Sequence, residues 1–243
     1  MKTLSSPILS IDTGHADGSV AVLAGAQCVV LPLGTQREHA LLLAAAVRDA
    51  MAQAGCRYED LACIAINRGP GSFTGLRVGV ASAKSIAWSS SRPLVAFSSF
   101  ESFGRAAFAF AESVEHLRDD GIRSIPIAFD AGRGDVFAAR ATASDTSGDL
   151  LIGEPRLMAS DRWFSEQLEG TLVIVPQAMR SIARDHGLVV PDEATFRPTA
   201  EWGAMAAARR IARGESDDPF SIVPVYMRPS YAEEHPGTNP PRA

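Results

Sequence analysis

A glycine-rich stretch, residues 68–79, has residue types suited to binding an anion or to very close packing. It reads Arg-Gly-Pro-Gly-Ser-Phe-Thr-Gly-Leu-Arg-Val-Gly and lies between the apolar run 61–66 and a small-residue segment from Leu76 to about Trp88. Glycines at such a junction permit positive φ angles, and backbone N–H groups at a helix start attract phosphate. Alternatively, the glycines let a second helix or a partner subunit approach closely. The composition favours neither interpretation over the other.

Four residues are candidate contacts for a phosphate or a nucleotide. Gly71 and Ser72 lie in the glycine-rich stretch, whereas Asp12 and Thr13 follow the first predicted strand. Ligands usually bind at the carboxyl ends of strands in an open α/β sheet, where a carboxylate can hold a metal-bound water and a hydroxyl can touch phosphate. The alternative for Asp12 is that it caps the turn through Gly14.

Several common catalytic motifs are absent from the sequence. No lysine follows Gly75 as a P-loop requires, the glycine-rich stretch has no G-x-G-x-x-G spacing, and no G-x-S-x-G elbow presents a nucleophile. Ser72 and Thr74 are therefore expected to form hydrogen bonds rather than covalent intermediates. The three cysteines lack metal-type spacing, and the five histidines are expected to be solvated or to cap helices, so no metal site is predicted.

The composition is that of an ordinary globular protein. The 243 residues are 46% hydrophobic and 21% charged, which is enough to bury a substantial core in one or two domains. A formal net charge of −5 argues against a chain that binds nucleic acid by itself. No signal peptide or membrane span is predicted, and the odd number of cysteines fits a reducing compartment, so a cytoplasmic protein is expected.

The elements that position these residues form an α/β pattern in the first half of the chain. The predicted strands are 8–11, 19–23, 27–31, 61–66 and 94–97. An apolar stripe predicts a helix from residue 38 that ends at Gly55, and a second helix follows the glycine-rich stretch. Ser98 and Glu101 have the spacing of a capping box that opens a third helix. Parallel strands with helical crossovers imply a layered α/β structure.

The pattern of the first strands recurs in the second half. A strand that ends at Asp130 passes through a glycine-bearing turn into a strand at 135–139, as the strand ending at Asp12 does, which suggests internal duplication. The turn 130–135 is expected to be structural rather than catalytic. The weaker predicted elements are a helix near 161–168, a strand at 172–175, a helix at 200–212 ended by Gly214, and a flexible tail at 229–243.

Several motifs together resemble the TsaB (YeaZ) family of bacterial accessory proteins in tRNA threonylcarbamoyladenosine biosynthesis. In chain order they are Ile11-Asp12-Thr13, His39, residues 68–79, Ser98-Ser99-Phe100-Glu101, residues 130–137 and residues 223–228. The match spans nearly the full chain. It implies two related lobes of the actin-like ATPase (RNase H-like) fold, each with a mixed sheet and helices, the second degenerate. The expected N-terminal lobe is 1–110, with the glycine loop and partner-binding helices, and the C-terminal lobe is 111–228.

The resemblance implies a non-catalytic subunit that binds and activates the catalytic homologue TsaD, with the ATPase TsaE. The complex would form N6-threonylcarbamoyladenosine at position 37 of tRNAs reading ANN codons and would be this chain's only route to tRNA. The chain itself would require no cofactor, although ATP or ADP could bind at the subunit interface. Helices of the first lobe would form the heterodimer interface. When TsaD is missing, this chain could form a homodimer through a similar face. The expected interface residues are Gly75, Leu76, Val78, Gly79 and Ala83, whose small members suit close helix approach.

One departure from the catalytic homologue supports a non-enzymatic role. The homologue carries two metal-binding histidines after the strand corresponding to 94–97, and residues 98–102 contain none. The alternatives are an independent enzyme of the actin-like superfamily, either a phosphotransferase or an M22-type metallopeptidase, and a stand-alone homodimeric interaction protein. Gly75→Leu or Gly79→Leu is expected to disturb partner assembly while leaving most of the fold intact.

Overall fold

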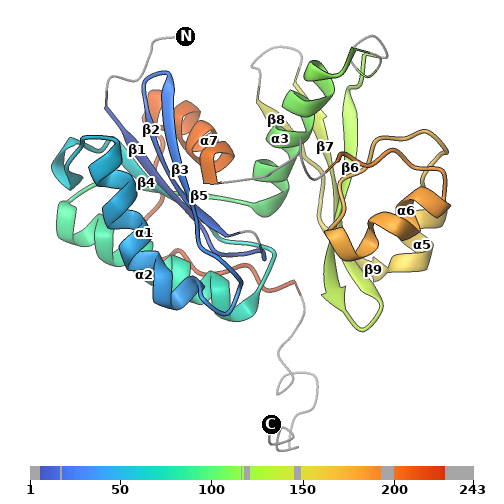
Figure 1. Cartoon of the computed structure of the whole chain (residues 1–243), viewed down its shortest axis with the longest axis horizontal. Coiled ribbons are helices and arrows are strands. Elements are labelled where there is room, and N and C mark those ends of the chain that lie inside the picture. Colours follow the sequence, from blue (N-terminus) through green and yellow to red (C-terminus); the bar gives the residue numbers. More distant parts are fainter. Residues whose placement is uncertain are drawn as a thin grey trace, which may run out of the picture.

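Two β-sheets, each covered by helices, make up the computed structural model (Figure 1). The structure describes residues 6–16, 18–115, 117, 121–144, 149–192 and 200–227. The predicted α/β fold with two sheet-and-helix lobes is confirmed. The predicted flexible tail, 229–243, lies outside the described residues.

The first sheet has the strand order β3-β2-β1-β4-β5. Its strands are β1 (Ile8–Asp12), β2 (Ser19–Ala24), β3 (Gln27–Pro32), β4 (Cys63–Asn67) and β5 (Leu94–Phe97). The first three strands form an antiparallel meander, and β4 and β5 join it in parallel, as predicted. Because parallel strands end at the same edge of a sheet, β1 and β4 place Asp12 and Asn67 beside each other.

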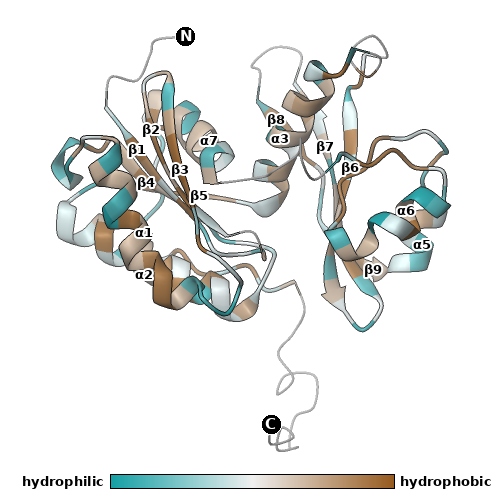
Figure 2. Ribbon diagram, in the orientation of Figure 1, coloured by the Kyte–Doolittle hydropathy of each residue, from teal (hydrophilic) through white to brown (hydrophobic). Residues whose placement is uncertain are grey.

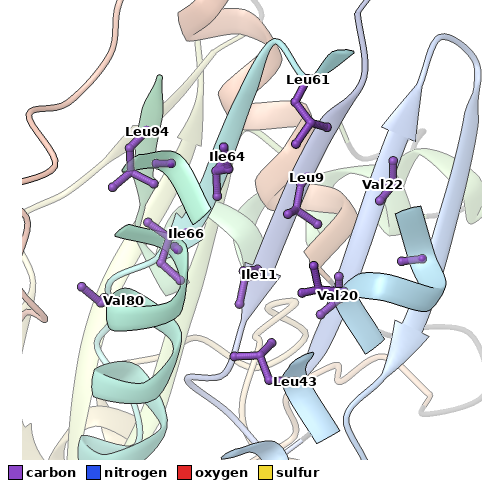
Figure 3. Close-up of a cluster of buried hydrophobic side chains, with 14 of the residues drawn as sticks. Leu9, Ile11, Val20, Val22, Leu43, Leu61, Ile64, Ile66, Val80 and Leu94 are labelled. Atoms are coloured by element: carbon purple, nitrogen blue, oxygen red, sulfur yellow. The ribbon is translucent and has the colours of Figure 1, made fainter. Parts of the chain in front are cut away.

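Helices cover both faces of the first sheet. On one face, α1 (His39–Gln53) and α2 (Phe73–Ser90) enclose a core that includes Leu9, Ile11 and Val80 (Figure 3). On the other face, strand residues such as those of β5 pack against the alanines of α7 (Ala200–Ala212). Successive strand side chains point to opposite faces, so the sheet separates two apolar layers.

Two boundaries in the first half follow from local hydrogen bonds. Helix α2 begins at Phe73, earlier than the predicted Leu76, because the Ser72 hydroxyl accepts from the Gly75 N–H at 3.2 Å and caps the helix. Helix α1 ends before Gly55, whose φ of +64° is the left-handed conformation that glycine tolerates, as predicted. A 3-10 turn, η1 (Tyr58–Asp60), was not predicted.

The second sheet repeats the arrangement of the first in reduced form. It contains β6 (Ser124–Gly132), β7 (Asp135–Ala143), β8 (Leu150–Ile152) and β9 (Arg156–Ala159), with β7 paired to all three others. The predicted strand 172–175 is wrong in extent, since this segment forms only isolated parallel bridges. These are Ile127↔Ile174 and Leu172↔Val189.

The second sheet also has helices on both faces. Helix α3 (Ser99–Ser113) packs on one face, and the Ser98 hydroxyl accepts from the Glu101 N–H at 3.1 Å, as the capping-box spacing predicts. The opposite face carries α5 (Ser160–Ser165), which ends before the predicted residue 168, and the unpredicted elements η2 (Gln177–Met179) and α6 (Arg180–Asp185).

Helices α3 and α7 lie side by side between the two sheets (Figure 1). Helix α3 follows the first sheet in sequence yet packs on the second, whereas α7 follows the second sheet yet packs on the first. The lobe boundary at residue 110 stays a prediction. Figure 2 shows that hydrophobic residues concentrate on the strands of the first sheet. Among the helices of the described residues, none is long and apolar enough to cross a membrane.

Candidate functional site

The carboxyl edge of the first sheet carries a buried polar pair, Asp12 and Asn67. The Asn67 side-chain amide donates to Asp12 Oδ2 at 3.0 Å, and the Gly14 N–H donates to Asp12 Oδ1 at 2.9 Å. Asp12 is only 4% exposed and Asn67 is fully buried. Both carboxylate oxygens of Asp12 therefore accept hydrogen bonds from within the chain, and the turn through Gly14 that the sequence suggested is present.

Ser99 extends this pair toward the second lobe. Its hydroxyl lies 2.7 Å from the Pro70 carbonyl, which can only accept, so the single Ser99 proton is directed there. The Ser99 oxygen then accepts from the Asn67 amide at 2.9 Å and from His15 Nε2 at 2.8 Å. In this arrangement His15 Nε2 is the protonated nitrogen that faces Ser99.

The orientation of the Asn67 amide is set by the glycine-rich stretch. The Gly69 N–H donates to Asn67 Oδ1 at 2.8 Å, which turns the NH2 group toward Asp12. Residues 12–15, Asn67, the turn at 69–70 and Ser99 therefore form one connected set of hydrogen bonds, which we call the Asp12 network. Sequence reasoning identified Asp12 but missed Asn67, because a strand-ending asparagine alone is a weak signal.

The remaining predicted phosphate contacts lie next to this network. Thr13 donates from its hydroxyl to the Gly75 carbonyl at 2.7 Å and is fully buried. The Ser72 N–H donates to the Gly14 carbonyl at 2.7 Å. A Cβ at Gly71 would overlap the same carbonyl. The structure thus brings the four candidates together, and these hydrogen bonds hold the turn after β1 against the start of α2.

The predicted partner residues on α2 are mostly internal. Gly75, Leu76, Gly79 and Ala83 are buried, and a Cβ at Gly75 or Gly79 would overlap Thr13. The small residues suggested close approach by an external helix. In the structure, that close approach is made by the turn after β1 of the same chain. Val78 alone of the five is partly exposed, and the interface on the first lobe stays a prediction.

The outward side of α2 carries a different stripe of residues. Its exposed members recur at helical spacing, and they are Phe73, Arg77, Ala81, Ser85 and Trp88. Trp88 is 70% exposed and Phe73 is 46% exposed. The middle of the stripe is small, whereas its ends are aromatic.

The segment 217–227 lies along α2 and completes the two ends of the stripe. The Phe220 ring is 5.4 Å from the Trp88 ring, and the Tyr226 ring is 4.9 Å from the Phe73 ring. Both Phe220 and Tyr226 are exposed, at 73% and 45%. We refer to the α2 stripe with Phe220 and Tyr226 as the α2 surface.

Contacts along its length hold this segment in place. The Arg77 guanidinium lies over the Phe73 ring and donates to the Tyr226 hydroxyl at 2.8 Å. Lys84 donates to the Ile222 carbonyl at 3.1 Å, and the Ile222 side chain joins the core under α2. The α2 surface is thus built from two regions of the chain that are far apart in sequence.

The histidines differ from the expectation of solvated or capping residues. His39 is 1% exposed, and neither ring nitrogen has a hydrogen-bond partner in the structure. His15 contacts the Phe103 and Phe129 rings at 4.8 and 4.7 Å. The His186 ring stacks on Phe164. His116 and His235 lie outside the residues whose side chains the structure describes. The described residues contain no group of three or more metal-ligating side chains.

The cysteines are not activated as nucleophiles. Burial raises the pKa of Cys63 to about 12, and burial together with the charge of Glu201 raises the pKa of Cys28 to about 12. Because the thiolate is the reactive form, both side chains are unreactive near neutral pH.

The chain is similar to proteins of tRNA modification. It matches the family model of TsaD, tRNA N6-adenosine threonylcarbamoyltransferase, over residues 26–169. It is 28% identical over 235 residues to the tRNA threonylcarbamoyladenosine biosynthesis protein TsaB of Escherichia coli (strain K12), covering 93% of this chain and 96% of that protein. It is 31% identical over 156 residues to the protein of the same description from Bacillus subtilis (strain 168), covering 63% of each.

Solved structures share the whole fold. A crystal structure from Pseudomonas aeruginosa, described as an uncharacterized protein with similarity to peptidase YeaZ, has a TM-score of 0.74 at 25% identity and covers 92% of this chain and 100% of that chain. YeaZ from Pseudomonas aeruginosa has a TM-score of 0.71 at 25% identity, covering 91% of this chain and 100% of that chain. These likenesses extend through both lobes and confirm the predicted actin-like, RNase H-like architecture.

Proposed function

The chain belongs to the TsaB (YeaZ) family, and from this membership we propose that it is a non-catalytic subunit of the complex that forms N6-threonylcarbamoyladenosine at position 37 of tRNAs reading ANN codons. Its involvement in tRNA threonylcarbamoyladenosine biosynthesis follows from the family. In the proposal the chain is cytoplasmic, and it binds and activates a TsaD-like catalytic homologue with a TsaE-like ATPase. It meets tRNA only through that complex.

The observation that carries the non-catalytic role is the closed Asp12 network. A catalytic centre needs an acid, a base or a metal ligand whose reacting atoms can reach a substrate. Both oxygens of Asp12 instead accept hydrogen bonds from Gly14 and Asn67, and the Ser99 hydroxyl is directed at Pro70. The polar groups at this edge therefore hold the turns together, which supports a structural role.

The same edge is where a nucleotide would be expected from the actin-like fold. Phosphate binding at a helix start depends on backbone N–H groups that are available to the ligand. In this chain the N–H groups of Ser72 and Gly75 already donate to Gly14 and to the Ser72 hydroxyl. These two N–H groups are therefore not available to a phosphate in this conformation. The proposal therefore requires no cofactor on this chain, and ATP or ADP at the subunit interface remains part of the proposal for the complex.

The α2 surface supports the partner role in the proposal. Aromatic residues are common energetic anchors of an interface, and small residues between them let a partner helix come close. Trp88 with Phe220 and Phe73 with Tyr226 supply the anchors, and Ala81 lies between them. This surface replaces the buried glycines as the site at which we place the TsaD-like partner.

Charge favours a different chain over a second copy at this surface. The sequence of α2 contains Arg77 and Lys84 but no aspartate or glutamate. An isologous dimer through α2 would bring these cations toward their own copies, whereas a partner with carboxylates would pair with them. A homodimer through this face is therefore expected only when the TsaD-like partner is missing.

Reconstitution of the modification reaction tests the proposed function. The mixture contains TsaD and TsaE homologues, the synthase that makes threonylcarbamoyl-adenylate, ATP, threonine, bicarbonate and tRNA. We expect N6-threonylcarbamoyladenosine to form only when this chain is added, and none to form when this chain replaces TsaD. Modification without TsaD would contradict the non-catalytic role, and modification that is equal with and without this chain would contradict the accessory role.

A further inference from the structure

The two lobes are joined by a cluster of charged side chains at one end of α3 and α7. Helix α7 packs on the first sheet, and Asp149 lies directly before β8 of the second sheet. Asp149 Oδ2 is 2.9 Å from a guanidinium nitrogen of Arg213, and its Oδ1 is 3.8 Å from one of Arg209. A single carboxylate of the second lobe thus contacts two arginines that lie at the end of a helix on the first sheet.

A third arginine approaches Asp149 from within the second lobe. Arg105 of α3 lies 3.9 Å from Asp149 Oδ1 and 3.3 Å from Glu101 on its own helix. The Arg105 side chain is only 10% exposed, and that of Asp149 is 27% exposed. These charges are shielded from water more than those of an ordinary surface pair.

The cluster continues along the first lobe to the edge of its sheet. Arg213 donates to Glu215 at 2.6 Å, and Glu215 also lies 3.4 Å from Arg210. Arg210 in turn contacts Asp217 at 3.0 Å and donates to the Ala96 carbonyl of β5 at 2.8 Å. The Asp217 carboxylate accepts from the Ala96 N–H at 2.8 Å.

This set of side chains has as many acids as bases. Its members, which we call the Asp149 network, are Glu101, Arg105, Asp149, Arg209, Arg210, Arg213, Glu215 and Asp217. Isolated surface ion pairs contribute little to stability, but several half-buried charges in one network do contribute. Within the network, the contacts of Asp149 with Arg209 and Arg213 cross from the second lobe to the end of α7.

We propose that Asp149 is an ionic latch that holds the second lobe against α7 and so sets the angle between the two lobes. The other contacts between the lobes are the packing of His15 on Phe103 and Phe129, the hydrogen bonds of Ser99 with Asn67 and His15, and the packing of α3 along α7. Loss of the carboxylate charge at residue 149 removes the contacts of the second lobe with Arg209 and Arg213, and the lobes then sample a wider range of angles.

Distance measurements between the lobes by electron–electron double resonance test the latch. Spin labels are attached to cysteines placed at Gln53 on α1 and at Leu168 after α5, both of which are exposed. Cys28 and Cys56 are replaced by serine, and Cys63 is buried and unreactive. In this background Asp149→Asn is expected to shift the distance distribution and broaden it relative to the labelled parent.

Three further samples make the result specific. Arg213→Gln should shift and broaden the distance distribution as Asp149→Asn does. The variant with both substitutions should differ little from Asp149→Asn, because each substitution removes the same ion pair between Asp149 and Arg213. Salt at 1 M, where the Debye length is about 3 Å, should broaden the parent distribution in the same sense. Glu166→Gln is the matched control, since it neutralises an acid whose 2.8 Å pair with Arg162 stays within the second lobe.

Either of two results would overturn the latch. One is an unchanged distribution in Asp149→Asn while circular dichroism shows a folded chain. The other is an equal change in Glu166→Gln, which would indicate a general effect of charge. Thermal unfolding of each labelled variant is measured in parallel. If Asp149→Asn does not fold, the distance distribution of Arg213→Gln decides the question.

Discussion

The two lobes of this chain share one arrangement of strands, turn and covering helices, but they differ in the features that surround it. Each begins with a strand that carries an aspartate at or near its end, Asp12 as the last residue of β1 and Asp130 two residues before the end of β6. In each lobe, the aspartate carboxylate accepts a hydrogen bond from the N–H of the glycine two residues later in the chain. The distances are 2.9 Å from Gly14 and 2.7 Å from Gly132. Each sheet then has a helix on one face that belongs, by sequence, to the other half of the chain. This repetition agrees with the internal duplication suggested by the sequence.

The differences lie around these shared turns and in the helices. Asp12 is buried and bonded to Asn67, whereas Asp130 is exposed. The outer helices of the first lobe, α1 and α2, are 15 and 18 residues long, whereas α5 and α6 of the second are 6 residues each. The first lobe therefore has the buried polar network and the long outward helix, and the comparison teaches that the shared scaffold forms without these features.

The largest effect is expected from enlarging the internal glycine stripe. Gly79→Leu should lower the free energy of unfolding by about 3 kcal/mol, because its side chain would overlap Thr13 in a packed interior. Helix propensity offsets only about 1 kcal/mol of this loss. Urea unfolding measures the change. This expectation corrects the sequence-based one, in which such a variant leaves most of the fold intact.

The matched variant for Gly79→Leu lies two residues away on the outward side of α2. Ala81 is exposed, so Ala81→Leu should leave the urea midpoint of unfolding nearly unchanged. The same change should weaken binding of the TsaD homologue by blocking close approach of a partner. If the two variants unfold at the same urea concentration, the distinction between the inner and outer sides of α2 fails.

A large effect on binding is expected from the aromatic anchor of the α2 surface. Trp88→Ala should weaken binding of the TsaD homologue by about 2 kcal/mol or more, as for a buried interface tryptophan, without changing stability. Isothermal titration calorimetry measures it. Ile182→Ala on α6 is the control from the second lobe, since Ile182 is also exposed, at 42%. Equal losses for the two variants would refute the assignment of binding to the first lobe.

The paired aspartates sharpen the comparison of the turns. Asp12→Ala should cost about 1–3 kcal/mol of stability, because it leaves one N–H of the buried Asn67 amide without its acceptor. Asp130→Ala should change stability by about 0.5 kcal/mol or less, since its side chain is exposed. Thermal and urea unfolding compare the two. A larger loss for Asp130→Ala would show that the second turn is the structural one.

The smallest effect is a pH dependence at the edge of the first sheet. Burial alone would raise the pKa of Asp217, but hydrogen bonds from Arg210 and the Ala96 N–H lower it below its ordinary value of 3.8. A lowered folded-state pKa gives stability that is fully present above that ordinary value and is lost as pH falls through the folded pKa. Partial exposure limits this contribution to about 1 kcal/mol or less.

Unfolding measured from pH 6 downward checks this expectation. Asp217→Asn should flatten the acid limb of the stability profile in the range below about pH 4, where the parent loses its contribution. Glu166→Gln, from an exposed pair of the second lobe, is the control and should follow the parent. An acid limb in Asp217→Asn that is as steep as in the parent would contradict the assignment.

Local sequence signals predicted the first lobe well. Short apolar runs located β1 to β5, and the Ser98 to Glu101 spacing located the start of α3. The signals failed where the second lobe departs from regular structure. Residues 172–175 have strand composition but form only bridges, and the short helix α6 has too few turns for a periodic pattern.

The sequence predicted four residues at the candidate site, Asp12, Thr13, Gly71 and Ser72, but not the side chains that bind Asp12. Asp12 was identified by its place at a strand end, but its partners Asn67 and Ser99 come from distant elements and carry no local signal. The sequence also could not predict whether the small residues of α2 face the interior or a partner, because glycine and alanine suit an internal contact and an external one equally. The α2 surface depends on Tyr226, which reaches Arg77 from 149 positions away.

The most direct test of the account compares one inner and one outer variant of the first lobe in the reconstituted modification reaction. Asp12→Asn and Trp88→Ala are each added to the TsaD and TsaE homologues with the synthase, its substrates and tRNA, after both are shown to be folded. The account predicts that Asp12→Asn still supports formation of N6-threonylcarbamoyladenosine and that Trp88→Ala does not. Loss of modification with Asp12→Asn and retention with Trp88→Ala would contradict it.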